Sequence, residues 1–171
     1  MDTQEVERQF IALITANQQV IYKVCYVYAT DDYTLEELYQ ETVINLWKAF
    51  PKFRGDSKIS TWIYRIGMNT CISYFQKSSS ELRTIPISFD LGVSFTYEDS
   101  DKNYYLQELY RMINKLGKLE RALVLLWLEE RSYQEISDIL GISKNNVAVK
   151  LNRIKEKQKT MSNQYTEDLR I

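Results

Sequence analysis

The sequence contains no histidine and only two cysteines among its 171 residues. Without histidine, the Ser-His and Cys-His pairs of common hydrolases cannot form, and the most frequent general base of enzymes is missing. Cys25 and Cys71 lie far apart with no CxxC spacing, so they do not predict a zinc site. Both occupy apolar positions of a helical pattern, which favours reduced thiols in a core. The composition argues against an enzyme and predicts no metal or other cofactor.

Glycine and proline are also scarce, with five and two residues, which leaves little turn chemistry for a many-stranded sheet. Hydrophobic residues make up 44% of the chain, enough for real cores, so long helices are expected. No stretch approaches the roughly 18 apolar residues of a membrane span. The first ten residues lack the basic-then-apolar pattern of a secretory signal. We therefore expect a cytoplasmic protein with no membrane contact of its own.

The charge is small overall but unevenly distributed. A net charge of −1 and an isoelectric point near 5.7 argue against a protein that coats nucleic acid generally. Between Lys144 and Lys159, however, six lysine or arginine residues stand against one acid, Glu156. Such a concentration on one segment is the footprint of a protein that binds a DNA groove.

Apolar side chains recur at helical spacing throughout residues 1–77. The first segment reads as one long helix or as two, with Asn17 near a possible break. A second helix begins at a capping box formed by Thr34 and Glu37. A third helix, over residues 59–77, is apolar on two sides and must therefore be packed on two sides. These features predict one helical domain.

The periodicity disappears in residues 78–103, which predicts an extended linker between domains. It returns in residues 104–160, and a polar, frayed tail is expected over residues 161–171. Within the second domain, Gly141 supplies the turn between two helices, and Ser143 caps the second of them. The predicted fold is all-α, with two small helical domains joined by an extended linker.

Two helices joined by a short turn around Gly141, the second of them basic, form a helix-turn-helix signature. An ordinary helical hairpin with a solvated basic face would explain the charge. It would not explain Ala148 and Val149 on the outward side, where a β-branched residue adds neither helix propensity nor burial. Short apolar side chains on a groove-facing helix can contact thymine methyl groups. The segment therefore predicts binding to the major groove.

The stretch FRGDSKISTWIYRIGMN, residues 53–69, combines aromatic, basic and amide side chains. Aromatic rings can stack on unstacked bases, cations can hold phosphate, and an amide can read a base edge. Trp62 and Tyr64 also have the spacing of ordinary core residues. From the residues alone, single-strand binding and core packing both stay open.

In the chain, the FRGDS stretch comes first, then the linker, and then the helix-turn-helix. Together, in this order, they resemble the extracytoplasmic-function (ECF) sigma factors of bacterial RNA polymerase. The resemblance extends from about Phe10 to Gln158 and is carried by LYQETVINLWKAFPKFRGDSKISTWIYRIGMN and by LERALVLLWLEERSYQEISDILGISKNNVAVKLNRIKEK. It implies that residues 1–77 are sigma region 2 and residues 104–160 are region 4. The implied partners are core RNA polymerase, double-stranded minus-35 DNA, melted minus-10 DNA and an anti-sigma factor.

The resemblance also implies roles for particular side chains. On the polar and acidic outer face of the second helix, the residues implied to dock on core polymerase are Glu37, Gln40, Glu41, Asn45 and Trp47. Those implied to contact the minus-10 element are Phe53, Arg54, Gly55, Asp56, Ser57, Lys58, Thr61, Trp62, Tyr64, Arg65 and Asn69. Those implied to contact the minus-35 element are Ser143, Lys144, Asn145, Asn146, Ala148, Val149, Lys150, Asn152, Arg153 and Lys155.

Within these sets, the FRGDS loop and Asn69 are implied to accept a flipped base. The chain departs from the family pattern at Ala148 and Val149, where many relatives have arginine and serine, so its minus-35 sequence cannot be copied from them. It also has Gly67 where alanine is more usual, which predicts a looser helix just before Asn69.

Two other functions use the same features differently. A stand-alone helix-turn-helix regulator would pair the second domain with an N-terminal sensor or dimerisation domain, and a sensor would need a ligand pocket there. A helical anti-sigma or adaptor protein that binds only protein is disfavoured by the basic segment. The chain has no GxxxxGK[ST] phosphate loop, so DNA opening is expected to proceed without nucleotide hydrolysis by this protein.

Overall fold

The computed structural model describes residues 2–76 and 109–168, with side chains described for residues 2–74 and 109–160. The chain divides into two compact units, Met1–Asn114 and Lys115–Ile171. Every regular element in the described stretches is a helix, which confirms the all-α prediction. The predicted linker, residues 78–103, lies outside the described residues.

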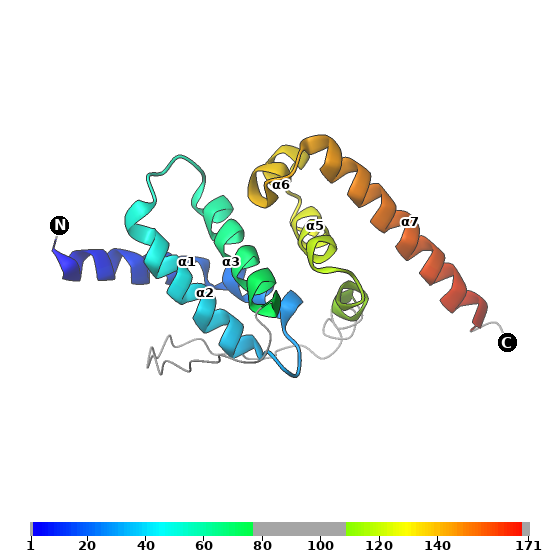
Figure 1. Ribbon diagram of the computed structural model, residues 1–171, viewed down its shortest axis with the longest axis horizontal. Coiled ribbons are helices and arrows are strands. Elements are labelled where there is room, and N and C mark those ends of the chain that lie inside the picture. The colour runs from blue at the N-terminus through cyan, green and yellow to red at the C-terminus, as the bar shows by residue number, and fades with distance from the viewer. Residues whose placement is uncertain (1, 77–108, 169–171) are drawn as a thin grey trace. The chain divides into compact units, whose positions relative to one another are not determined.

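The first unit consists of three long helices that pack against one another (Figure 1). They are α1 (Thr3–Tyr28), α2 (Leu35–Ala49) and α3 (Ile59–Gln76), and the short 3-10 helix η1 (Phe50–Lys52) follows α2 directly. α1 is one continuous helix, so the possible break at Asn17 does not occur. The Asn17 amide donates to the Leu13 carbonyl oxygen at 2.8 Å, within the same helix.

α2 begins where the sequence predicts. Thr34 Oγ1 accepts from the Glu37 backbone N–H at 3.3 Å, and Glu37 Oε2 accepts from the Thr34 backbone N–H at 3.0 Å. These reciprocal bonds form the predicted capping box and satisfy two N–H groups at the helix start. The cap orients the outer face of α2, which carries the residues implied to bind polymerase.

α3 is buried on two sides, as predicted, because it packs on both α1 and α2. Cys25 of α1 and Cys71 of α3 are both free thiols in this core, which confirms their interpretation as reduced core residues. A hydrogen bond with Cys25, followed by burial, raises the pKa of the Cys71 thiol. Cys25 Sγ also lies 3.6 Å from Thr42 Oγ1. The Cys71 thiol is therefore not suited to react as a thiolate.

Gly67 of α3 lies in this core where α3 meets α1 and α2. A methyl group added there would lie 3.4 Å from Val24 Cγ1 and 3.6 Å from Thr42 Cγ2, which is ordinary contact. Because glycine costs about 0.5–1 kcal/mol relative to alanine inside a helix, we expect Gly67→Ala to raise the free energy of unfolding by about that amount. Denaturant unfolding followed by circular dichroism measures the change. A loss of stability would show that Val24 cannot accommodate the methyl group.

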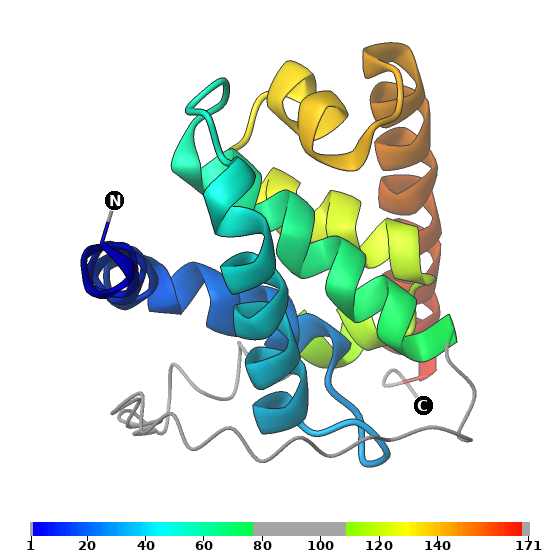
Figure 2. The same ribbon diagram turned by 60° about the vertical axis from the view of Figure 1, so that its left-hand side comes forward.

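The second unit contains α5 (Lys118–Leu128), α6 (Tyr133–Leu140) and α7 (Lys144–Asp168). Residues 109–114, which the sequence assigns to the second domain, are helical and are grouped with the first unit. Figure 2 shows α6 and the start of α7 joined by a short turn. The inward residues of these two helices are Ile136, Ile139, Val147, Leu151 and Ile154.

The turn between α6 and α7 has the predicted chemistry. Gly141 adopts φ +68°, the left-handed conformation that favours glycine, and its N–H donates to the Ser137 carbonyl oxygen at 2.9 Å. Ser143 Oγ then accepts from the Asn146 backbone N–H at 3.1 Å and caps α7. The helix-turn-helix prediction is confirmed.

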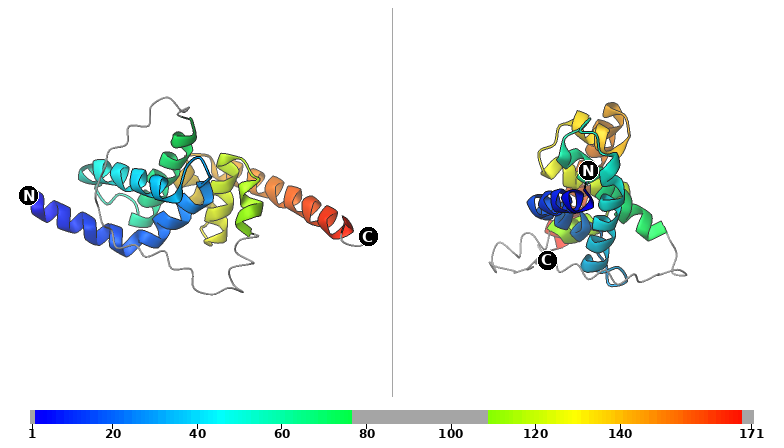
Figure 3. Two further views of the ribbon diagram at one scale, coloured as in Figure 1. Left: turned by 90° about the horizontal axis from the view of Figure 1, so that it is seen from below. Right: turned by 90° about the vertical axis from the view of Figure 1, so that its left-hand side faces the viewer.

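α7 runs well past α5 and α6 (Figure 3). It does not end near residue 160, where the sequence analysis places the end of the second domain, but continues to Asp168. No glycine or proline stands between Lys144 and Asp168 to stop it. Of the described side chains, Ile154 is the last one buried on this helix.

Candidate nucleic-acid and polymerase interfaces

The residues of α2 that are implied to bind polymerase fall into an exposed group and a half-exposed group. Glu37, Gln40 and Trp47 are exposed, and Trp47 stays 37% accessible although its ring meets that of Phe10 at 5.0 Å. Glu41 is only half-exposed, on the side of α2 that borders α3. Exposed carboxylate, amide and indole groups suit a protein partner.

Asn45 belongs with Glu41 to the half-exposed group, and its side chain contacts α3. Asn45 Nδ2 donates to Thr70 Oγ1 at 3.1 Å. Its position on the outer face of α2 in the sequence pattern therefore does not make it a freely presented group.

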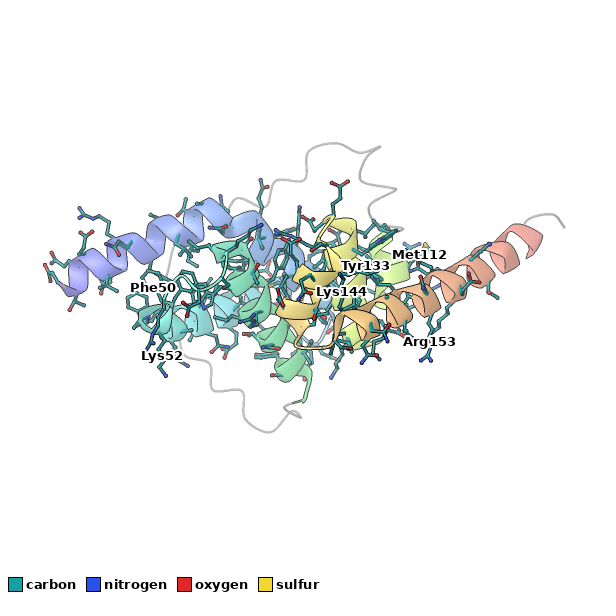
Figure 4. The ribbon with its side chains drawn as sticks, turned by 90° about the horizontal axis from the view of Figure 1, so that it is seen from above. Phe50, Lys52, Met112, Tyr133, Lys144 and Arg153 are labelled. Atoms are coloured by element: carbon teal, nitrogen blue, oxygen red, sulfur yellow. The ribbon has the colours of Figure 1, made fainter. Side chains whose placement is uncertain are left out.

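The loop between α2 and α3 is anchored by an aromatic cluster. The Phe53 ring lies 4.8 Å from that of Trp62, which in turn lies 6.5 Å from that of Phe50. Beyond Phe53 the chain turns at Gly55, whose φ of +77° favours glycine. Phe53 and Ser57 are half-buried, whereas Arg54 and Asp56 are exposed. The loop thus presents a polar tip on a fixed base, and Figure 4 shows Phe50 and Lys52 at this end of the unit.

The remaining residues implied to contact the minus-10 element lie on or just before α3, and some are buried whereas others are exposed. Thr61, Trp62 and Tyr64 point into the unit, with exposed fractions of 7%, 9% and 0%. Of the two alternatives that the sequence left open for Trp62 and Tyr64, core packing is therefore the one that the structure shows. The exposed set on the same segment is Lys58, Arg65 and Asn69. The exposed side chains can contact DNA directly, whereas the buried side chains can only hold α3 in the conformation that presents them.

A surface pocket of about 240 Å³ opens between α2 and α3. It brings Asn69, implied to read a base, together with Glu41 and Asn45, implied to bind polymerase. Sequence reasoning missed the rest of the lining, although the spacing of three and four residues around Asn69 was the available signal. The other lining residues are Ile66, Thr70, Ser73 and Tyr74.

The pKa of Tyr74, which lines this pocket, reports on the charges around it. Burial, and then the carboxylates of Glu37 and Glu41, raise the pKa of its hydroxyl, with a further contribution from Tyr33. The Tyr33 ring also packs edge-on against that of Tyr74 at 5.2 Å. Two carboxylates of α2 therefore impose a negative potential on the α3 side of the pocket.

α7 presents most of the side chains implied to contact minus-35 DNA. Figure 4 shows Lys144 near its start and Arg153 further along the same helix. Ala148 and Lys150 are half-exposed, whereas Val149 is 39% exposed although it is apolar. The exposed members are Ser143, Lys144, Asn145, Asn146, Val149, Asn152, Arg153 and Lys155.

One contact of α7 was not expected from the sequence. Lys155 Nζ lies 4.5 Å from the centroid of the Trp127 ring, a cation–π arrangement between α7 and α5. Trp127 and its neighbour Leu128 remain 41% and 40% exposed at the end of α5. Trp127 thus positions Lys155, which the resemblance places near phosphate.

Across the described parts of both units, no helix combines the length and apolar character needed to cross a membrane.

Two family models match the chain. The model of Sigma-70 region 2 matches residues 13–81, and that of Sigma-70 region 4 matches residues 106–157. The RNA polymerase sigma factor YlaC of Bacillus subtilis is 28% identical over 144 residues, which cover 81% of this chain and 83% of YlaC. The ECF RNA polymerase sigma-E factor of Escherichia coli is 30% identical over 132 residues, covering 70% of this chain and 69% of that protein.

Among the solved structures that share the fold are two complexes. CnrH in complex with the cytosolic domain of CnrY aligns over 92% of this chain and 90% of CnrH, with a TM-score of 0.66 and 16% identity. The sigma factor RpoE of Bartonella quintana, in complex with the anti-sigma factor NepR, aligns over 94% of this chain and 98% of its own length, with a TM-score of 0.63 and 15% identity.

The geometry described above and the sequence matches agree over most of the chain. A three-helix unit with an exposed acidic face corresponds to region 2, and a capped helix-turn-helix with a basic second helix corresponds to region 4. The chain therefore belongs to the ECF family of RNA polymerase sigma factors, non-enzymatic initiation factors that direct the polymerase to promoters.

Proposed function

We propose that the two domains divide promoter recognition between them. Residues 1–77 join core polymerase, read the minus-10 element and help to open it, and residues 104–160 read the minus-35 element. The observation that carries the proposal is the pairing, in one chain, of an exposed acidic helix face with a basic helix-turn-helix. A stand-alone regulator would not need the α2 face or the FRGDS loop.

The docking surface for core polymerase is proposed on α2. Glu37, Gln40 and Trp47 are its exposed members, and Trp47 supplies a large apolar anchor of the kind found at interface centres. Glu41 and Asn45 lie at its edge, on the side that borders α3.

The minus-10 site is proposed on the loop after α2 and on the exposed side of α3. Arg54, Lys58 and Arg65 are exposed cations suited to phosphate, and Asn69 opens into the pocket described above. Flipping a base costs a few kcal/mol, which binding in a pocket can offset. Thr61, Trp62 and Tyr64 hold α3 in place from the core.

The minus-35 site is proposed on the N-terminal half of α7. Val149 and Ala148 are apolar groups suited to thymine methyls, and Asn152 and Arg153 lie close by on the same helix as base readers. Lysines flank them for phosphate contacts, so binding should weaken steeply with salt.

We further propose that the protein acts in the cytoplasm and has an anti-sigma factor as a partner. The two solved structures described above are complexes, CnrH with the cytosolic domain of CnrY and RpoE with the anti-sigma factor NepR, and they support this proposal.

The proposal is tested by adding the full chain to core polymerase and transcribing fragments of the native genome. We expect start sites that core polymerase alone does not use, each preceded by two sequence elements shared among them. If transcription equalled that of core polymerase alone, the proposed function would be wrong.

A further inference from the structure

Trp127 lies in the last turn of α5, and its ring faces the ammonium group of Lys155 on α7. The distance from Lys155 Nζ to the ring centroid is 4.5 Å, within the roughly 6 Å over which a ring face attracts a cation. Burial does not account for an indole at this position. Trp127 is 41% exposed, whereas the four residues that precede it on α5 are all buried. The ring therefore serves the surface of the unit and not its core.

The backbone around Trp127 is fixed by the cap that ends α5. The Glu130 N–H donates to the Trp127 carbonyl oxygen at 3.0 Å, and the Arg131 N–H donates to the Leu126 carbonyl oxygen at 3.1 Å. These are the two bonds of a Schellman cap, in which Glu130 takes the left-handed conformation at φ +57°. Because α5 also packs against α7, the cap holds the indole at a fixed place beside α7.

Lys155 lies on the side of α7 that carries two residues of the proposed minus-35 site. It follows Asn152 by three residues and Ala148 by seven, and these spacings place the three side chains on one helix face. Asn152 is exposed, as Lys155 is, and Ala148 is half-exposed. A long side chain on this face can reach a phosphate beside the bases that its neighbours contact.

A ring face holds an ammonium group without cancelling its charge. In the described parts of the chain, no carboxylate forms an ion pair with Lys155. A carboxylate partner would neutralise the lysine and would also repel the phosphates of DNA. An aromatic ring attracts the cation through its quadrupole and carries no net charge. Lys155 is therefore kept in one place with its full positive charge available to a phosphate.

We propose that Trp127 is a positioning residue for minus-35 binding, because its ring holds Lys155 where that lysine contacts a phosphate of the DNA. The inference rests on the proposed function, since it assumes that α7 lies in the groove of the minus-35 element. A free lysine side chain loses rotamer freedom when it binds a phosphate. A lysine that the ring already holds loses less, so the contact contributes more to affinity.

A protein partner would be a different occupant of this surface, because Leu128 beside Trp127 is also apolar and 40% exposed. The charge around the ring argues for DNA. Between Lys144 and Lys159, every charged residue except Glu156 is a lysine or an arginine, and such a surface attracts phosphate. An apolar partner would also have to displace the Lys155 ammonium from the ring.

The test uses holoenzyme assembled from the full chain and core polymerase, and a duplex promoter fragment identified by the transcription assay above. Affinity is measured at several salt concentrations. Lys155→Gln should weaken binding and reduce the slope of log affinity against log salt by about one, as expected for one lost phosphate contact. Trp127→Leu should weaken binding by roughly two- to fivefold, the effect of losing an exposed cation–π contact. Trp127→Phe should keep most of the affinity, because phenylalanine also presents a ring face.

Combining the two substitutions separates positioning from a structural role. If the ring acts through the lysine, Trp127→Leu should have no further effect on affinity in the Lys155→Gln variant. A general loss of stability would instead weaken binding in both backgrounds. Leu128→Ala is the matched control, because it removes the neighbouring exposed apolar side chain, and it should leave promoter affinity unchanged.

The inference would be overturned, while the proposed function stood, if Trp127→Leu weakened binding equally in both backgrounds or if Trp127→Phe lost as much affinity as Trp127→Leu. An unchanged salt slope for Lys155→Gln would also overturn it. So would a loss by Trp127→Leu of affinity for core polymerase alone, which would identify a protein-docking surface. If wild-type holoenzyme bound the promoter fragment no better than an unrelated duplex, the proposed minus-35 function would fail as well.

Discussion

Leu151→Ala is expected to lower the free energy of unfolding of the second unit by about 2–5 kcal/mol. Leu151 is 1% exposed, on the inner side of α7, and its truncation leaves a cavity beneath the helix-turn-helix. Whole domains are stable by only about 5–15 kcal/mol, and small ones lie toward the lower end. Minus-35 binding should therefore fall sharply, whereas association with core polymerase through α2 is retained. Denaturant unfolding and a polymerase binding assay on the full chain measure the two effects.

Leu128→Ala is the matched control for this substitution. It removes the same atoms from the same unit, but Leu128 is 40% exposed at the end of α5. A surface change of this kind alters stability by roughly 0.5 kcal/mol or less. Equal losses for the two variants would show that burial in this unit does not determine its stability.

Arg153→Ala is expected to weaken binding of the holoenzyme to its promoter by roughly 5- to 150-fold, the effect of losing an arginine contact to a base. Arg153 is exposed on α7, one residue after Asn152. Because the contact reads sequence, the variant should also discriminate less among bases at one position of the minus-35 element. Binding to promoters with substitutions across that element, at several salt concentrations, measures both effects.

Lys115→Ala is the control for loss of a positive charge, since Lys115 is exposed in the second unit but lies outside α7. It should change affinity little. A uniform weakening by Arg153→Ala across all sequences would instead identify a phosphate contact, and Arg153 would no longer be a base reader.

The helix caps and the turn between α6 and α7 were the most predictable parts of the fold, because they depend on neighbours in the chain. The capping box of Thr34 and Glu37 and the left-handed turn at Gly141 are both local structures, and both occur where the sequence places them. The possible helix break near Asn17 did not occur, because an amide side chain inside a helix can donate a hydrogen bond to the preceding turn, as Asn17 does to the Leu13 carbonyl oxygen.

The candidate site was predictable only in part. An aromatic residue at helical spacing has the same pattern whether it faces the core or a base, so Trp62 and Tyr64 stayed ambiguous until the packing of α3 placed them inside. Helical spacing could have grouped the α3 side of the pocket, but it could not pair Glu41 with Asn69, since these residues are distant in the chain and meet only through the packing of α2 on α3.

The sequence by itself determined the helical class, the caps, the basic helix-turn-helix and the sigma-factor family, because each of these is a local pattern or an order of such patterns. Only the tertiary structure decided which side chains are presented to a partner. The packing of α3 against two helices buries Tyr64 and exposes Asn69, and the bond from Asn45 to Thr70 turns Asn45 toward α3. Exposure depends on which faces of two helices meet, and that depends on contacts between segments far apart in the chain.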